Sequence, residues 1–105
     1  MKPVFETTGT CLNIKLPEEL DHPASDEIRR DSDRIIGHNY IKNMIFDFSE
    51  TVFMDSSGIG ILIGRKKTMD MHAGKVTAVN LGERVYKIFE KSGLFQIISL
   101  EEEEK

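Results

Sequence analysis

The sequence predicts a single α/β domain built on a mixed, mostly parallel β-sheet. Segments of alternating or continuous apolar residues are followed by segments whose apolar residues have helical spacing, an order typical of βαβ units. Of the 105 residues, 39% are hydrophobic and 30% are charged, as in a globular protein with one core. We therefore expect one domain over residues 1–100 and a solvated or frayed acidic tail, Glu-Glu-Glu-Glu-Lys, over residues 101–105.

The N-terminal segment predicts a β-hairpin. Leu12, Ile14 and Leu16 alternate with other side chains over residues 11–16, which is the period-2 pattern of a half-buried strand. Gly9 lies in a Thr-Gly-Thr turn that connects this strand to a shorter one near Val4 to Glu6.

A helix is predicted next. Asp21 can cap its N-terminus, Pro23 suits an early helical position, and either Gly37 or Asn39 ends it. Four apolar residues form the inner stripe of this helix, which Asp31 and Ser32 interrupt: Ala24, Ile28, Ile35 and Ile36.

The C-terminal half continues the alternation of strands and helices. Residues 44–48 are nearly all apolar, which predicts a central strand covered on both faces. A second helix begins after Asp55, a buried strand follows Gly74 over residues 75–80, and a third helix ends at Gly93. A last short strand is expected near Gln96 to Ser99.

The start of the second helix carries an Asp-Ser-Ser-Gly sequence. Asp55 can be the N-cap, which places Ser56 and Ser57 in the first turn, where free N–H groups and the helix dipole favour a negative group such as phosphate. Met54 and Ile59 then occupy the positions of a hydrophobic staple. Spacing alone does not distinguish a modification site from an ordinary helix cap.

Three glycines follow in the same helix, at positions 58, 60 and 64. Each costs about 1 kcal/mol of helix propensity relative to alanine. The pattern indicates close approach of another backbone, either from the sheet beneath or from a partner above.

Charge and cysteine content exclude several classes. The formal net charge of -4 leaves no basic face for general nucleic-acid binding. The only cysteine, Cys11, cannot form an internal disulfide, and no apolar stretch approaches the roughly 20 residues of a membrane span. We expect a cytoplasmic protein that does not bind membranes and is monomeric when free.

No catalytic, cofactor or metal site is predicted. A G-x-S-x-G elbow and a phosphate-binding glycine loop are both missing, and His22, His38 and His72 lack the spacing of a triad. One cysteine and three scattered histidines offer no metal-ligand cluster. We expect a protein that is not an enzyme and has no cofactor.

Three segments resemble one family. The sequences FMDSSGIGILIGRKK, ELDHP and FEKSGLFQII resemble, in order and spacing, the bacterial anti-sigma factor antagonists of the STAS domain family, and the resemblance runs from about Leu12 to Ile98. Family members commonly carry glycine before the Glu-Leu-Asp segment, where this chain has Pro17 and Glu18, so we expect a reshaped loop there.

The resemblance implies a phosphorylation switch. In the family the serine directly after the motif aspartate is the phosphoacceptor, which here is Ser56. The unmodified protein is then expected to bind an anti-sigma factor, which is itself a serine kinase of the GHKL type, and so to release a sigma factor. A PP2C-type phosphatase is expected to reverse the modification.

The expected contact surface lies around the same serine. We expect Asp21, Asp55, Ser57 and Gly58 to contact the partner, with Ile59 and Ile61 added if they face outward, although a core position is favoured for Ile59. Arg65, Lys66 and Lys67 are expected to form a solvated helix end. The alternative function is a STAS scaffold, or a subunit of a signalling or transport assembly, that is not phosphorylated.

Overall fold

The structure is a computed structural model that describes residues 2–101. The elements in chain order are β1 (Val4–Thr8), β2 (Cys11–Lys15), β3 (Glu19–Leu20), α1 (His22–His38), β4 (Asn43–Asp47), β5 (Phe53–Met54), α2 (Ser56–Met71), β6 (Lys75–Val79), α3 (Glu83–Ser92), a 3₁₀ turn (Leu94–Gln96) and β7 (Ser99–Leu100). The predicted α/β class is confirmed.

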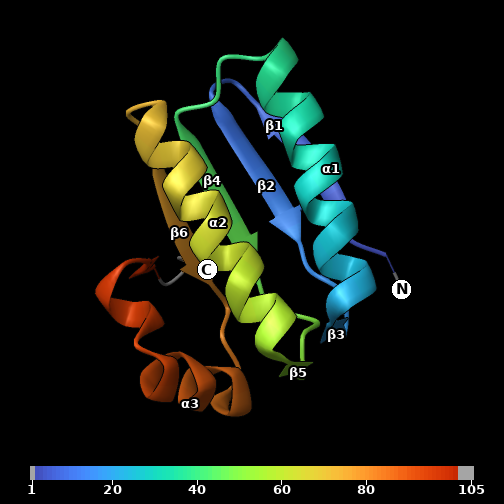
Figure 1. Cartoon of the computed structure of the whole chain (residues 1–105), viewed down its shortest axis with the longest axis vertical. Helices are drawn as coiled ribbons and strands as arrows, with labels where there is room; N and C mark the ends of the chain where they lie inside the picture. Colours follow the sequence, from blue (N-terminus) through green and yellow to red (C-terminus); the bar gives the residue numbers. More distant parts are fainter. Residues whose placement is uncertain (1, 102–105) are drawn as a thin grey trace.

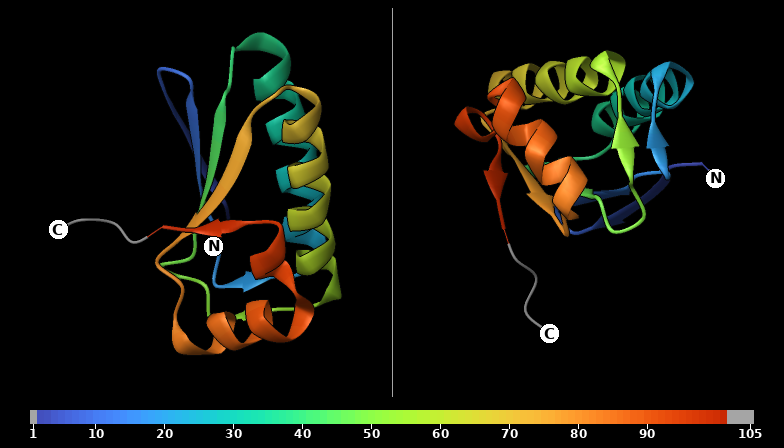
Figure 2. Two further views of the ribbon diagram at one scale, coloured as in Figure 1. Left: turned by 90° about the vertical axis from the view of Figure 1, so that its left-hand side faces the viewer. Right: turned by 90° about the horizontal axis from the view of Figure 1, so that it is seen from below.

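The main sheet has five strands in the order β1-β2-β4-β6-β7. β1 is antiparallel to β2, whereas the other neighbours are parallel. Figure 1 shows α1 and α2 lying next to each other in front of the sheet, and the side view in Figure 2 shows that both lie on the same face. Among the described residues no helix covers the opposite face, so the prediction that β4 is covered on both faces is wrong.

The open face explains that error. One row across the strands consists of Glu6, Asn13, Ile45, Thr77 and Ser99, which are neighbours in register. Ile45 is the member of this row that belongs to β4, and it is the only apolar one. It fills the gap between the buried Met44 and Phe46, so β4 looks continuously apolar in the sequence although this face is polar on the neighbouring strands. The alternating burial of β4 therefore follows the pattern of a strand with one solvent-facing side.

Asp47 is a partly buried carboxylate on this open face, and it accepts hydrogen bonds from two neighbouring residues. Burial raises the pKa of Asp47. The hydrogen bonds that its carboxylate accepts from the Asn80 side chain (3.0 Å) and the Ser49 N–H (2.9 Å), together with the charge of Lys15, lower the pKa by more than burial raises it. The net result is a pKa below the ordinary value of aspartate. Asn80 adopts a left-handed backbone (φ 61°) immediately after β6, and this places its amide beside the carboxylate.

The core lies between the sheet and the helices. Leu12 and Phe46 from the sheet and Ile28 and Leu62 from the helices are fully buried. The predicted stripe of α1 is confirmed, because Ile28 is in the core and the remaining three, Ala24, Ile35 and Ile36, pack against it.

The third helix closes one end of the core. α3 ends at Gly93, which is left-handed (φ 79°) as predicted. Phe89 of α3 contacts Phe48 edge to face, with 5.4 Å between ring centroids. Figure 2 shows α3 at the same end of the molecule as the starts of α1 and α2.

The C-terminal prediction needs one correction, at the start of the last strand. Gln96 belongs to the 3₁₀ turn, because Leu94 folds back into the core and its carbonyl accepts N–H groups from Ile97 and Ile98, so the last strand begins only at Ser99. Glu101 is exposed, which agrees with a solvated tail, although its N–H donates to the Ala78 carbonyl at 2.9 Å. The rest of the predicted acidic tail lies outside the described residues.

Candidate functional site

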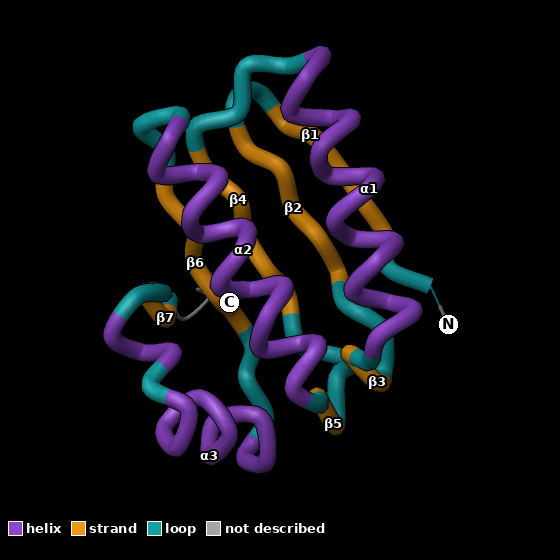
Figure 3. The backbone as a smooth tube through the Cα atoms, viewed as in Figure 1, coloured by secondary structure: helices purple, strands orange, loops and turns teal. Residues whose placement is uncertain are grey.

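Two helices begin side by side at one end of the molecule. β3 and β5 form a separate two-stranded parallel sheet in which Glu19 pairs with Phe53 and Leu20 with Met54. The next residue on each strand is an aspartate, Asp21 before α1 and Asp55 before α2. Asp21 and Asp55, both expected to contact the partner, are therefore brought to the same end of the molecule, as the adjacent β3 and β5 in Figure 3 show.

Additional hydrogen bonds join the two segments that carry these aspartates. The Thr51 hydroxyl donates to the Pro17 carbonyl at 2.8 Å, and the Val52 N–H donates to the Glu18 carbonyl at 2.8 Å. The Asp55 N–H donates to the Leu20 carbonyl at 3.3 Å. The loop that departs from the family pattern is thus tied to the segment before Ser56. This pairing was not predicted, because two-residue strands have no readable periodicity.

Both aspartates cap their helices, as predicted. The Asp55 carboxylate accepts the Ser57 N–H at 2.8 Å and the Gly58 N–H at 3.2 Å. The Asp21 carboxylate accepts the Ala24 N–H at 3.1 Å. These bonds satisfy backbone donors that the first turn of a helix leaves free.

The two serines differ in exposure. Ser56 is the first residue of α2 and is exposed, whereas Ser57 is half-buried. Ser56 is therefore the more accessible of the two serines. Met54 is buried and Ile59 packs against the core, as expected for a staple.

The glycines of α2 separate into two kinds. A Cβ at Gly58 would lie 2.6 Å from the Leu20 carbonyl oxygen, so here the predicted close approach to another backbone is confirmed. A Cβ at Gly60 or Gly64 would meet nothing within 4 Å in the described part of the chain, so the sheet does not explain those two glycines.

Arg65 contradicts the prediction of a solvated helix end. Its side chain is only 7% exposed and forms an ion pair with Asp33, which is 56% exposed. It also donates to the Ser32 hydroxyl at 3.0 Å, and Ser32 is fully buried. Helical spacing explains the burial, because positions 58, 61, 62, 65 and 69 form the inner face of α2. Ile61 is likewise buried and does not face outward as a partner contact.

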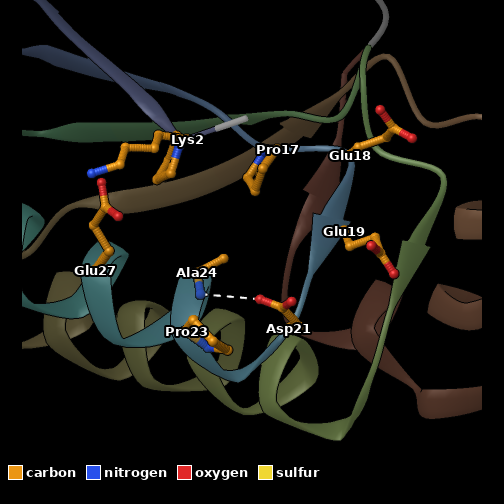
Figure 4. Close-up of a pocket in the computed structure, with 9 residues that line it drawn as sticks. Lys2, Pro17, Glu18, Glu19, Asp21, Pro23, Ala24 and Glu27 are labelled. Atoms are coloured by element: carbon orange, nitrogen blue, oxygen red, sulfur yellow. Dashed lines mark hydrogen bonds between the residues drawn. The ribbon is translucent and has the colours of Figure 1, made fainter.

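Two concave regions flank the helix starts. The first, of about 410 Å³, lies beside Asp21 and is lined by Lys2 and by acidic residues that include Glu18, Glu19 and Glu27. Figure 4 shows the Asp21 carboxylate turned toward Ala24 of α1. Within residues 2–101 no group of three or more metal-ligating side chains is assembled.

The second concave region is a groove between α1 and α2, with a volume of about 270 Å³. α1 contributes Ser25 and Arg29, and α2 contributes Ser57, Gly60, Gly64 and Arg65. Ser25 Oγ and Arg65 Nε are buried and have no hydrogen-bond partner among the described residues. Ser25 was not predicted as a site residue, because a serine on the inner face of a helix has no distinctive pattern.

The length and composition of the helices also show whether one of them could span a membrane. Over residues 2–101, no helix combines the length and the apolar character needed to cross a bilayer.

Comparison with known proteins identifies the family. The STAS domain model matches residues 2–105. An anti-sigma F factor antagonist of Paenibacillus polymyxa is 31% identical over 93 residues, which covers 89% of this chain and 80% of that protein.

Two solved structures are also similar. The anti-sigma factor antagonist SpoIIAA in its unphosphorylated form has a TM-score of 0.86 at 31% identity, covering 98% of this chain and 89% of that one. The Bacillus cell fate determinant SpoIIAA in the phosphorylated form has a TM-score of 0.78 at 30% identity, covering 98% and 92%. The chain therefore belongs to the STAS domain family, and its relatives in that family include anti-sigma factor antagonists.

Proposed function

We propose that this protein is an anti-sigma factor antagonist that is switched off by phosphorylation of Ser56. Unmodified, it binds an anti-sigma factor and so releases a sigma factor. The anti-sigma factor is a serine kinase of the GHKL type, and a PP2C-type phosphatase restores the active form. All of these steps take place in the cytoplasm.

One observation carries the proposal: Ser56 is an exposed first-turn residue that directly follows the cap Asp55, and the strand before Asp55 pairs with the strand before the cap Asp21. An exposed hydroxyl at a helix N-terminus accepts a phosphate without loss of a buried contact, and the helix dipole partly offsets the added charge. The similarity to SpoIIAA, which has been solved with and without phosphate, supports the same chemistry here.

Charge explains how phosphate prevents binding. A phosphoserine adds a charge of about -1.5 to -2 at pH 7. Asp55 is adjacent in sequence and Asp21 follows the paired strand, so the phosphate joins two carboxylates at the same surface. An acidic or apolar partner surface is then repelled, while the domain stays folded. Asp21, Asp55, Ser57 and Gly58 form or support the rest of this contact surface.

The competing function is a STAS scaffold that binds its partner regardless of modification. Binding of the unmodified protein, Ser56→Asp and Ser57→Asp to the anti-sigma kinase, measured by calorimetry, separates the two functions. The switch predicts strong binding of the unmodified protein and loss of binding for Ser56→Asp. Equal affinities for the unmodified protein and Ser56→Asp would support the scaffold instead.

A further inference from the structure

We propose that the groove between α1 and α2 is a second contact surface for the same anti-sigma partner. A segment of that partner packs its backbone against Gly60 and Gly64 and presents an acceptor oxygen toward Ser25 and Arg65. This inference rests on the proposed function, because it concerns the partner that recognises Ser56.

The glycines provide the first argument. Gly60 and Gly64 lie four residues apart, on one face of α2 and within its interior, where glycine weakens a helix relative to alanine. A Cβ at either position meets nothing within 4 Å among residues 2–101, in contrast to Gly58. Contacts within the described chain therefore do not account for these two glycines, whereas a backbone placed against them does.

The second argument is independent of the first. Ser25 and Arg65 line the same groove, each is 6% exposed, and Ser25 Oγ and Arg65 Nε have no hydrogen-bond partner among the described residues. Buried polar groups in proteins are nearly always paired. A hydroxyl and an N–H are each satisfied by an acceptor, such as a peptide carbonyl or a carboxylate oxygen.

The hydrogen bonds and ion pairs around the groove involve neither Ser25 Oγ nor Arg65 Nε. Another nitrogen of the Arg65 guanidinium donates to Ser32 and Asp33 on α1, which fixes the side chain, whereas the buried Nε has no hydrogen-bond partner among residues 2–101. On the rim, Asp26 forms an ion pair with Arg29, so its negative charge is partly neutralised. An incoming oxygen therefore meets less repulsion from this carboxylate.

Continuity with the phosphorylation site indicates which partner occupies the groove. Ser57 lines the groove and is adjacent in sequence to Ser56. A kinase that transfers phosphate to Ser56 must cover this end of α2, so the part of its surface next to the catalytic centre lies over the mouth of the groove.

The test uses the whole chain, the anti-sigma kinase and five variants, one of which, Ser56→Asp, reports on the proposed switch. Gly60→Ala and Gly64→Ala place a methyl group in the groove, and Ser25→Ala removes the unpartnered hydroxyl. Gly37→Ala is the matched control, because Gly37 is also helical, has nothing within 4 Å of its Cβ and lies outside the groove. Kinase affinity is measured by calorimetry and the Tm of the free protein by thermal melting.

We expect all three glycine variants to raise the Tm, because alanine is the better helix former. Only Gly60→Ala and Gly64→Ala should also weaken kinase binding, on the order of tenfold, through overpacking of the contact. Ser25→Ala should keep or raise the Tm while lowering affinity several-fold. Gain of stability with loss of affinity excludes misfolding as the cause.

Two results would overturn the inference alone: unchanged affinity of both groove glycine variants while Ser56→Asp still loses binding, or a groove that mediates only self-association of this chain. If the unmodified protein shows no binding to the kinase, both the proposed function and this inference fail. Binding of the unmodified protein, together with its loss in Ser56→Asp, thus distinguishes the two failures.

Discussion

Gly58 packs directly against the Leu20 carbonyl, so closely that a Cβ on residue 58 would lie 2.6 Å from that oxygen and 3.1 Å from Met54 Cβ. This contact places the first turn of α2 against the end of β3. Because Leu20 precedes the cap of α1 and Met54 precedes the cap of α2, the same contact fixes the spacing of Asp21 and Asp55. The positions of the two aspartates near Ser56 therefore depend on the contact between Gly58 and Leu20.

Gly58→Ala should therefore destabilise the protein. The clash involves backbone, which yields little, and overpacking of this kind costs about 1–3 kcal/mol, partly offset by better helix propensity. Urea unfolding measures the loss. Gly60→Ala is the matched control, two residues further along α2 and open to space, and should be more stable than the unmodified protein. Equal stability of the two variants would show that the Leu20 contact is not tight.

The pair formed by Arg65 and Asp33 holds α1 against α2. Asp33→Asn removes the charge opposite a guanidinium that is almost fully buried, and should lower the free energy of unfolding by about 1–3 kcal/mol. Asp26→Asn breaks exposed pairs with His22 and Arg29 on the same helix and should cost at most about 1 kcal/mol. Chemical denaturation of both variants checks the difference, and a larger effect of Asp26→Asn would refute this ranking.

Asp47 predicts a pH dependence of stability. Its pKa in the folded protein is lowered from an unfolded value of about 3.9, so the folded state favours the ionised carboxylate. The resulting stabilisation is fully present above the unfolded pKa and is lost as the pH falls through the folded pKa. Asp47→Asn should therefore be less stable than the unmodified protein at pH 7, and this difference should shrink below about pH 4.

Urea unfolding across pH 3 to 7 tests this, with Glu50→Gln as an exposed control for the loss of one negative charge. A stability difference between Asp47→Asn and the unmodified protein that stays constant down to pH 3 would rule out the assigned role of the carboxylate.

Ser56→Asp should leave the fold intact. A negative charge in the first turn of a helix changes stability by about 1 kcal/mol or less, because the dipole favours it while Asp55 opposes it. Ile61→Asp puts the same charge at a buried position of the same helix and should be destabilised by several kcal/mol. Thermal melting compares them. Unfolding of Ser56→Asp would mean that lost binding reports on stability and not on an interface switch.

Much of this molecule could be predicted from its sequence. The order of the long elements, the caps Asp21 and Asp55, and the stop at Gly93 follow from local patterns that the structure confirms. The open sheet face could not be predicted from β4 alone, because whether a face is covered depends on neighbouring strands that are distant in sequence.

The assignment of Ser56 as the modified residue stays a prediction, whereas the arrangement of the segments around it could not be predicted from the sequence. Ser56 follows the family pattern, whereas the pairing of β3 with β5 depends on backbone hydrogen bonds between segments more than thirty residues apart. The burial of Arg65 was missed because three consecutive basic residues resemble a solvated helix end, although only Arg65 lies on the inner face. The open surface of Gly60 and Gly64 likewise depends on how α1 lies against α2.

The most direct test of the switch is phosphorylation in vitro. The purified protein is incubated with the anti-sigma kinase and Mg-ATP, and the modified residue is located by peptide mass spectrometry, with Ser56→Ala and Ser57→Ala as controls. The account predicts phosphate on Ser56, abolished by Ser56→Ala and retained in Ser57→Ala. Stable binding to the kinase without phosphate on Ser56 would contradict it and leave Asp55 and its serines as a helix cap within a scaffold.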